Sequence, residues 1–242
     1  MTPIRTPTDR IFVALDLVDV DQAVAIARAL AGRVGGVKIG KQFFTANGPE
    51  GVRRVAEIGL PLFLDLKFHD IPSTVGAAVR AALPMKPFML NVHAAGGSRM
   101  MRAAAEAAAT AGDARPRVLA VTVLTSLGDP ELAELGMPVT LREHVTRLAV
   151  LAKSCGLDGV VCSCSELMAI RGACGQDFIL VCPGIRPTWA AGDDHRRLLT
   201  PAEALALGAD YLVIGRPIVK ADDPAAAVAR IGDEIAADLH VG

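Results

Sequence analysis

The segment LPLFLDLK, residues 60–67, is a short apolar run that ends in two charged side chains. Its nearly unbroken apolar character is typical of a β-strand buried on both faces in a parallel sheet. Seven further runs of this kind recur along the chain. They are IFVALD (11–16), GVKIG (36–40), PFMLNVH (87–93), RVLAVTVL (117–124), GVVCS (159–163), FILVCPG (178–184) and YLVIG (211–215). The sequence therefore predicts eight buried strands.

Between these runs lie stretches with helical periodicity and with residues typical of helix ends. The stretch at 19–32 starts with aspartates that can cap a helix, and it stops at Gly32. The stretch at 49–59 opens with Pro49 and closes with Gly59, which is the usual asymmetry of helix ends. Further helices are expected at 98–112, 140–156, 201–208 and 222–239.

The alternation of strand and helix predicts an α/β protein. Such a pattern forms either a closed barrel or a doubly wound sheet. Eight evenly spaced units within 242 residues favour a single (β/α)8 TIM barrel. We therefore expect one catalytic barrel domain at residues 11–242, preceded by an N-terminal tail at residues 1–10.

The composition narrows the class of protein further. Hydrophobic residues make up 52% and charged residues 21%, which is enough apolar material for a sizeable core. The 25 basic and 26 acidic residues leave no electrostatic footprint for nucleic acid or for a membrane surface. No apolar run approaches the ~18 residues of a membrane span, and the polar first ten residues do not resemble a signal peptide. Five cysteines without a zinc-binding pattern suit a reduced, cytoplasmic protein.

Most of the predicted strands end in a polar side chain. Active sites in (β/α)8 barrels lie at the C-terminal ends of the strands, so we expect these side chains to converge. They are Asp16, Lys38, Asp65 with Lys67, His93, Thr125 with Ser126, Arg186 and Arg216.

The third strand end carries the most unusual charges. Asp65 and Lys67 are two residues apart on a strand, so their side chains are expected on the same face, and Asp70 follows in the loop. Burying such charges costs several kcal/mol unless they are paired, so a salt bridge at the barrel mouth is the simplest interpretation. The nearby Asp16 and Lys38 favour a functional site instead. A lysine among carboxylates is stabilised as an ammonium and suits proton donation, which indicates a lyase that acts on an anionic substrate.

The last two strand ends favour a phosphate site. Gly184 and Arg186 follow the seventh strand, and Gly215 and Arg216 follow the eighth. Barrel enzymes commonly bind phosphate at these ends through backbone amides, and an arginine adds a charged fork. Each arginine alone could instead form a surface salt bridge. The polar segment at 187–197 is expected to be a lid over the phosphate, with an inert surface loop as the alternative.

With these residues in hand, the chain resembles the orotidine 5′-phosphate decarboxylase family from about residue 10 to residue 235. The segment DLKFHDIPSTV (65–75) matches the signature of that family. The motifs FVALD, GVKIGKQFF, NVHAAGG, VTVLTS, PGIRP, GDDHRRLLTP and VIGRPI match in order and spacing. The resemblance implies conversion of orotidine monophosphate to uridine monophosphate and CO2, for pyrimidine biosynthesis, with neither a metal nor an organic cofactor.

The resemblance also implies roles for individual residues. Catalytic roles are implied for Lys67, Asp65, Asp70 and Lys38. Lys67 would protonate the ring carbanion, and Asp65 would lie beside the substrate carboxylate with Lys38 as its charged neighbour. The family forms homodimers with shared sites, so Asp70 would reach into the pocket of the partner subunit.

Contacts with the nucleotide substrate are implied at both ends of the ligand. The substrate-binding residues would be Asp16, Lys38, Ile71, Thr74, Thr125, Ser126, Arg186, His195, Gly215 and Arg216. Ile71 and Thr74 would join Asp70 in the partner's pocket. His195 stands where the family usually has glutamine, and a histidine can still donate a hydrogen bond there.

Three other interpretations stay open. A sugar-phosphate decarboxylase or aldolase on the same scaffold would use magnesium, but Leu62, Phe63 and Leu64 occupy the acidic third-strand position that such a metal needs. A non-catalytic nucleotide-phosphate binding barrel would keep the arginines without needing Lys67. Locally, Ser73 and Thr74 could cap a helix rather than, or as well as, binding substrate.

Overall fold

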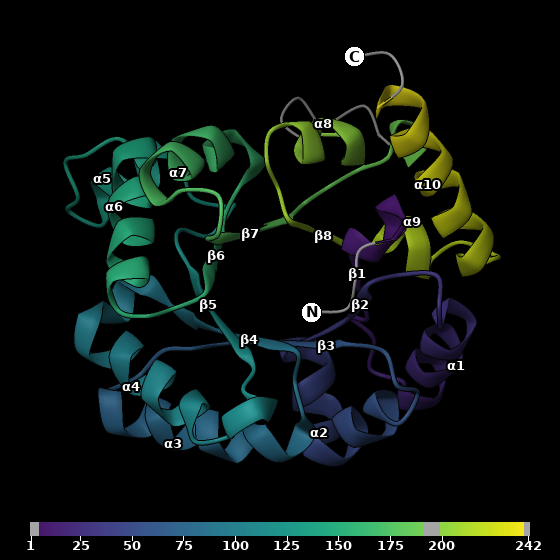
Figure 1. Ribbon diagram of the computed structural model, residues 1–242, viewed down its shortest axis with the longest axis horizontal. Helices are drawn as coiled ribbons and strands as arrows, with labels where there is room; N and C mark the ends of the chain where they lie inside the picture. Colours follow the sequence, from purple (N-terminus) through teal and green to yellow (C-terminus); the bar gives the residue numbers. More distant parts are fainter. Residues whose placement is uncertain (1–4, 191–198, 240–242) are drawn as a thin grey trace.

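The computed structural model describes residues 5–190 and 199–239. Eight parallel strands close into a barrel in sequence order, and the end-on view of Figure 1 shows them as a ring. The strands are β1 (Ile11–Ala14), β2 (Gly36–Gly40), β3 (Leu62–Phe68), β4 (Met89–His93), β5 (Arg117–Val121), β6 (Gly159–Val161), β7 (Ile179–Pro183) and β8 (Tyr211–Ile214). The predicted (β/α)8 barrel is confirmed, and each strand falls on the run that predicted it.

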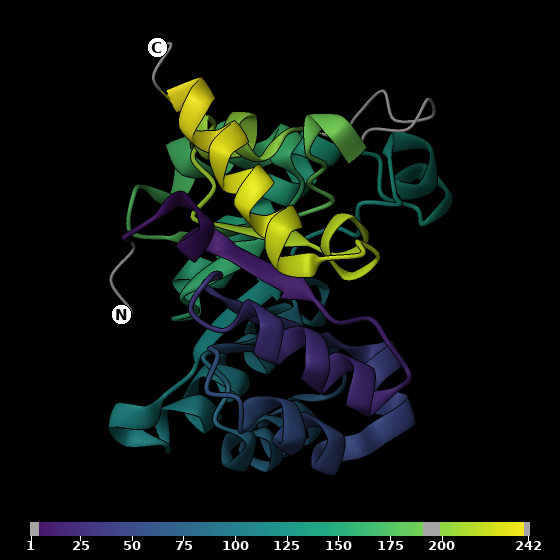
Figure 2. The ribbon, with the colours of Figure 1, turned by 90° about the vertical axis from the view of Figure 1, so that its right-hand side faces the viewer.

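Helices surround this ring on its outer side (Figures 1 and 2). They are α1 (Val20–Leu30), α2 (Lys41–Ala56), α3 (Pro72–Ala82), α4 (Gly97–Ala109), α5 (Asp129–Glu134), α6 (Leu141–Ser154), α7 (Leu167–Cys174), α8 (Pro201–Ala206), α9 (Arg216–Val219) and α10 (Pro224–Leu239). Short 3-10 turns are η1 (Pro7–Arg10), η2 (Leu83–Met85), η3 (Ala94–Gly96), η4 (Gly112–Ala114), η5 (Cys164–Glu166) and η6 (Thr188–Ala190). Within the two described ranges, no helix is long and apolar enough to cross a membrane.

Helix α2 is longer than the sequence predicts. It begins at Lys41, directly after β2, rather than at Pro49. Gly48 interrupts the helix with φ 60° and ψ −165°, and the chain then resumes a helical path at the proline. The prediction therefore identified only the second half, because Pro49 is a strong start signal that hid the helix before it.

Helix α3 was anticipated only through the possible caps Ser73 and Thr74, and its range was not predicted. It begins at Pro72 with Ile71 as its N-cap, so neither Ser73 nor Thr74 caps it, and that interpretation was wrong. Its buried face contains small side chains, among them Val75 and a glycine, which weakens the apolar periodicity in the sequence.

The core has two layers. One lies between the strands and the surrounding helices, and the other fills the barrel interior. Aromatic rings pack closely at the N-terminal end of the interior, where Phe12 meets Phe63 and Tyr211 edge to face at centroid distances of 6.4 and 5.4 Å. These rings fill the barrel interior at this end, and the cavities lined by the predicted site residues lie at the opposite, C-terminal end.

Candidate active site

A cavity of about 370 Å³ opens at the C-terminal ends of the strands. Its charged lining comes from β2 and β3, from the loops after β1 and β7, and from the first residues of α2 and α9. The charged side chains are Asp16, Lys38, Lys41, Asp65, Lys67, Arg186 and Arg216. A more apolar cavity of about 190 Å³ shares Lys38, Asp65 and Lys67 and adds Val121, Val161 and Thr125. The expected convergence of strand-end residues is therefore observed for most of them.

Four charges of alternating sign run across the floor of the cavity. The Lys38 ammonium lies 3.1 Å from an Asp16 oxygen and 3.1 Å from Asp65 Oδ2. The Lys67 ammonium lies 2.6 Å from Asp65 Oδ1. Gly40 makes room for this line, because a Cβ there would lie 2.7 Å from Asp16 Oδ1 and 3.0 Å from Lys38 Nζ. The side chains of Lys38 and Asp65 are only 8% and 11% exposed, so these interactions are little screened by water.

The charge line determines the ionisation of Asp65. Burial alone raises the pKa of this carboxyl group, but the ammonium groups of Lys38 and Lys67 lower it. Hydrogen bonds from Lys67 and Asn91 lower it further, and the net result is a pKa below the ordinary value. Asp65 is thus held as a buried carboxylate.

Asn91 is a site residue that the sequence analysis missed. It lies in the middle of β4, is fully buried, and donates from Nδ2 to Asp65 Oδ1 at 2.7 Å. Its Oδ1 accepts the backbone N–H of Lys67 at 2.8 Å. The available signal was an amide side chain inside an otherwise apolar run, since buried polar groups require partners.

The contact between Lys67 and Asp65 was predicted from side-chain alternation along a strand, but the backbone at Lys67 is irregular. Its φ is 52°, in the left-handed region, and the pairing of β3 with β4 shifts register between Leu64 and Phe68. Simple alternation along a strand therefore does not explain the contact, although the two side chains do meet. The irregular backbone turns the lysine into the cavity.

Two arginines form the other side of the cavity. Arg186 and Arg216 have no carboxylate within 4.0 Å in residues 5–190 and 199–239. Burial and the neighbouring charge of Arg216 lower the pKa of Arg186. Gly184 has a φ of 78°, which a larger side chain adopts only with strain, so the turn before Arg186 requires glycine. Two guanidinium groups that have no acidic partner in the described ranges, beside a backbone turn, suit a phosphate.

Two histidines, His69 and His93, lie close to each other. The rings of His69 and His93 lie 5.3 Å apart between centroids. Burial, then the charges of His69, Lys41 and Lys67, lower the pKa of His93 to about 4. His93 is therefore neutral at neutral pH.

Other predicted site residues lie outside the cavity of their own chain. Asp70, Ile71 and Thr74 are exposed in the loop and first turn after β3. Thr125 lines the apolar cavity, whereas Ser126 is exposed beside it. One subunit by itself therefore does not assemble all the predicted residues.

The predicted lid is described only in part. Residues 187–190 include η6, whose Thr188 is hydrogen bonded to Glu234 of α10. The Arg230 guanidinium, also from α10, lies 4.6 Å from the centre of the Trp189 ring. The rest of the segment, with His195, lies outside the described residues, and its contact with substrate stays a prediction.

Known proteins resemble this chain over nearly its whole length. The family model described as "Orotidine 5′-phosphate decarboxylase / HUMPS family" matches residues 9–231. Relatives named orotidine 5′-phosphate decarboxylase include one from Rhodospirillum rubrum, 52% identical over 93% of each chain. Another, from Chromobacterium violaceum, is 51% identical over 96% of this chain and 94% of the relative. A crystal structure of orotidine 5′-phosphate decarboxylase from Lactobacillus acidophilus superposes with a TM-score of 0.82 at 37% identity, covering 93% of this chain and 98% of that one.

Proposed function

Because this chain belongs to the orotidine 5′-phosphate decarboxylase family, it is a carboxy-lyase of pyrimidine biosynthesis, and we propose how its own side chains remove CO2 from orotidine 5′-phosphate. The observation that carries the proposal is the alternating line of Asp16, Lys38, Asp65 and Lys67. A line of this kind holds a buried carboxylate beside an ammonium, in the low-exposure floor of a cavity.

The phosphate of the nucleotide would bind between Arg186 and Arg216. Both guanidinium groups lack an acidic partner in the described parts of the chain, and the backbone of Gly215 adjoins them. Binding there places the sugar over the charge line, so that Asp16 and Lys38 can hold its hydroxyl groups. Thr125 and Ser126 would contact the base.

The substrate carboxylate would then lie against Asp65. Two facing carboxylates repel each other, and this repulsion is relieved when the carbon–carbon bond breaks and CO2 leaves. The electron pair stays on the ring carbon, beside the Lys67 ammonium. Lys67 would stabilise this carbanion and then transfer a proton to it, and the resulting amine regains a proton from water.

One proton donor is not enough to explain the reaction. Enzymes lower barriers by ~8–23 kcal/mol, whereas general acid catalysis supplies only about 10²–10⁴-fold. Most of the acceleration must come from charges that are already in place before the substrate binds. The buried contacts of Lys38 and Asp65, at 3.1 Å, are consistent with such preorganisation.

We further propose that the working enzyme is a homodimer with shared sites. Asp70, Ile71 and Thr74 are exposed outside the cavity of their own chain, and Ile71 is 63% exposed despite being apolar. An exposed isoleucine beside a carboxylate that has no basic partner among the described residues suits insertion into a partner's pocket. Asp70 would extend the line of charges from the other subunit. A cytoplasmic location stays a prediction.

A direct test follows the absorbance of orotidine monophosphate with the purified protein. We expect turnover that persists after prolonged treatment with a chelator, because no step above uses a metal. The substitution Lys67→Ala should lower kcat by about 10²–10⁴-fold or more while uridine monophosphate still binds. Near-normal turnover in Lys67→Ala, or chelator-sensitive activity, would contradict the mechanism.

A further inference from the structure

Asn91 is the one fully buried polar side chain that lies within β4, and it touches both members of the central ion pair. Its Nδ2 donates to Asp65 Oδ1 at 2.7 Å, and its Oδ1 accepts from the Lys67 backbone N–H at 2.8 Å. It does not line the charged cavity, so it has no direct path to the substrate. Its contacts nevertheless reach the two groups on which the proposed chemistry depends.

The contact between Asn91 Oδ1 and the Lys67 N–H compensates for an irregular backbone. β3 and β4 pair at Leu64 with Leu90 and again at Phe68 with Val92. Three residues of β3 therefore oppose Asn91 alone, so the regular ladder is interrupted at this point. The Lys67 N–H donates to the side-chain oxygen of Asn91 in the neighbouring strand β4.

This bond holds a strained conformation. Lys67 has a φ of 52°, and a residue other than glycine in the left-handed region adopts it only where the surroundings impose it. A normal extended conformation would direct the side chain differently along the strand. The Asn91 amide thus helps to fix the direction from which the Lys67 ammonium approaches the cavity.

The contact between Asn91 Nδ2 and Asp65 Oδ1 orients the Asp65 carboxylate. Asp65 Oδ1 accepts from Asn91 and from Lys67 Nζ at 2.6 Å, whereas Oδ2 faces Lys38 at 3.1 Å. With both oxygens engaged, the plane of the carboxylate cannot rotate freely. The hydrogen bond from Asn91 also lowers the pKa of Asp65.

We propose that Asn91 is a positioning residue that acts through Lys67 and Asp65, an inference that rests on the proposed decarboxylase chemistry. A single side-chain amide stabilises the left-handed backbone of Lys67 and fixes the plane of the Asp65 carboxylate. Its two ends have different tasks: the carbonyl oxygen holds Lys67, and the amino group holds Asp65.

The test compares two substitutions at this position. Asn91→Leu keeps a similar volume but removes both contacts, whereas Asn91→Asp keeps an acceptor for the Lys67 N–H and removes the donor to Asp65. We expect Asn91→Leu to lower kcat by about 10–10²-fold with little change in KM, because misplacement of a reacting group affects the transition state more than binding. Asn91→Asp should retain the backbone contact but place a second negative charge beside Asp65, which raises the pH at which Asp65 ionises.

The matched control is Val92→Ala, in the next residue of β4. Val92 is also fully buried, but it packs in the layer facing the helices. This variant should lower the unfolding midpoint while kcat, KM and the acid limb of the kcat–pH profile stay as in the wild type. In Asn91→Leu the acid limb should move to higher pH, a shift that general destabilisation does not produce.

A measurement independent of activity separates this inference from the proposed function. The ionisation of Asp65 can be followed by the 13C signal of its labelled carboxyl group, with the Asp65→Asn protein used for assignment. A higher titration midpoint in both Asn91 variants, but not in Val92→Ala, supports the positioning role even if the wild type does not act on orotidine monophosphate. Unchanged titration together with kcat within about twofold of the wild type would overturn it.

Discussion

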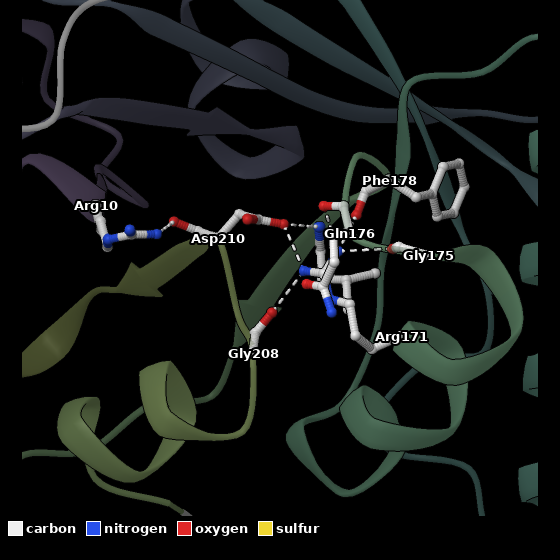
Figure 3. A network of polar contacts seen from close by, with 8 residues as sticks. Arg10, Arg171, Gly175, Gln176, Phe178, Gly208 and Asp210 are labelled. Atoms are coloured by element: carbon white, nitrogen blue, oxygen red, sulfur yellow. Dashed lines mark hydrogen bonds and ion pairs between the residues drawn. The ribbon is translucent and has the colours of Figure 1, made fainter.

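At the C-terminal end of the barrel, charged side chains face one another across a cavity, whereas at the N-terminal end they are tied to the backbone. Arg171 of α7 donates to the carbonyl oxygens of Gly175, Gln176, Phe178 and Gly208 and to Asp210 Oδ2, at 2.6–3.0 Å (Figure 3). Asp210 also accepts the backbone N–H of Leu180. This network connects α7 with the segments that lead into β7 and β8.

The same arrangement occurs two βα units earlier. Asp158 directly precedes β6, accepts the N–H of Val118 in β5 at 2.7 Å, and pairs with Arg115 at 2.9 Å. Asp210 directly precedes β8 and accepts from the second residue of β7 in the same way. Each aspartate thus links its own strand entrance to the neighbouring strand.

The two ends of the barrel therefore differ in whether their charged residues stabilise the fold. In the Arg171–Asp210 and Arg115–Asp158 pairs at the N-terminal end, backbone groups supply further partners, so the removal of a charge leaves backbone oxygens or N–H groups unsatisfied. At the C-terminal end, Arg186 and Arg216 have no acidic partner in the described ranges, and Lys67 is held in a strained backbone. Such incomplete pairing is costly for folding but leaves the charges available for an anionic ligand.

The largest expected effect is on activity at the C-terminal end. Asp70→Ala should lower kcat by at least about 10²-fold, because it removes one charge from the proposed shared site. The unfolding midpoint should change little, since Asp70 is exposed and, within residues 5–190 and 199–239, its side chain bonds only to the Ile71 N–H. The measurement is a kinetic assay together with thermal unfolding.

Mixing provides the control for sharing between subunits. Equal amounts of inactive Asp70→Ala and Lys67→Ala proteins, exchanged under mild denaturation and refolded, should recover about a quarter of wild-type activity, because half of the dimers then hold one intact site. A mixture as inactive as its components would mean that each subunit uses its own Asp70.

The second effect is on stability at the N-terminal end. Arg171→Ala should lower the free energy of unfolding by about 3–4 kcal/mol, because it strands a carboxylate and several carbonyl oxygens. Arg171→Lys should lose less, since it keeps the charge without the planar fork. Urea unfolding measures both, and kcat at 25 °C should stay close to the wild-type value.

The matched control is an arginine whose ion pairs are exposed. Arg53 pairs with Glu50 and Glu57 on the surface of α2, and its side chain is 56% exposed. Arg53→Ala should lower the free energy of unfolding far less than Arg171→Ala does, because water screens an exposed ion pair. If Arg171→Ala and Arg53→Ala lowered the free energy of unfolding equally, the backbone contacts of Arg171 would add nothing to stability.

The smallest effect is a pH dependence at the C-terminal end. The pKa of His93 is lowered to about 4 in the folded protein from 6.5, so the unfolded chain binds the proton more readily. The stabilising contribution of neutral His93 is therefore complete above pH 6.5 and is lost as the pH falls from 6.5 towards 4. The loss should be about 1–2 kcal/mol, because the ring is only partly buried and water screens it.

His93→Gln isolates this contribution. Unfolding by urea at several pH values should give a flatter dependence between pH 6.5 and 4 than in the wild type. If the free energy of unfolding falls with pH at the same slope in His93→Gln and in the wild type, a group other than His93 causes the loss of stability in acid.

Particular residues show how far sequence reasoning reached. Asp65, Lys67, Lys38 and Asp16 were predicted to meet because the carboxyl ends of parallel strands share one edge, and they do. Asn91 was missed because its role depends on a register shift that no local pattern reveals. Arg171 was missed because its partners are mostly backbone oxygens, which the sequence does not identify.

The barrel could be predicted from the sequence alone, since strand and helix periodicity are local properties repeated along the chain. It also determined which strand ends carry charge, because position in a parallel strand sets which end faces the cavity. Only the tertiary structure decided that Lys67 enters the cavity through a left-handed bulge supported by Asn91. It alone separated Asp65, which lies in the cavity, from Asp70, which lies outside it. The physical reason is that pairing between strands, and not the order of residues along one strand, sets side-chain direction wherever the ladder is irregular.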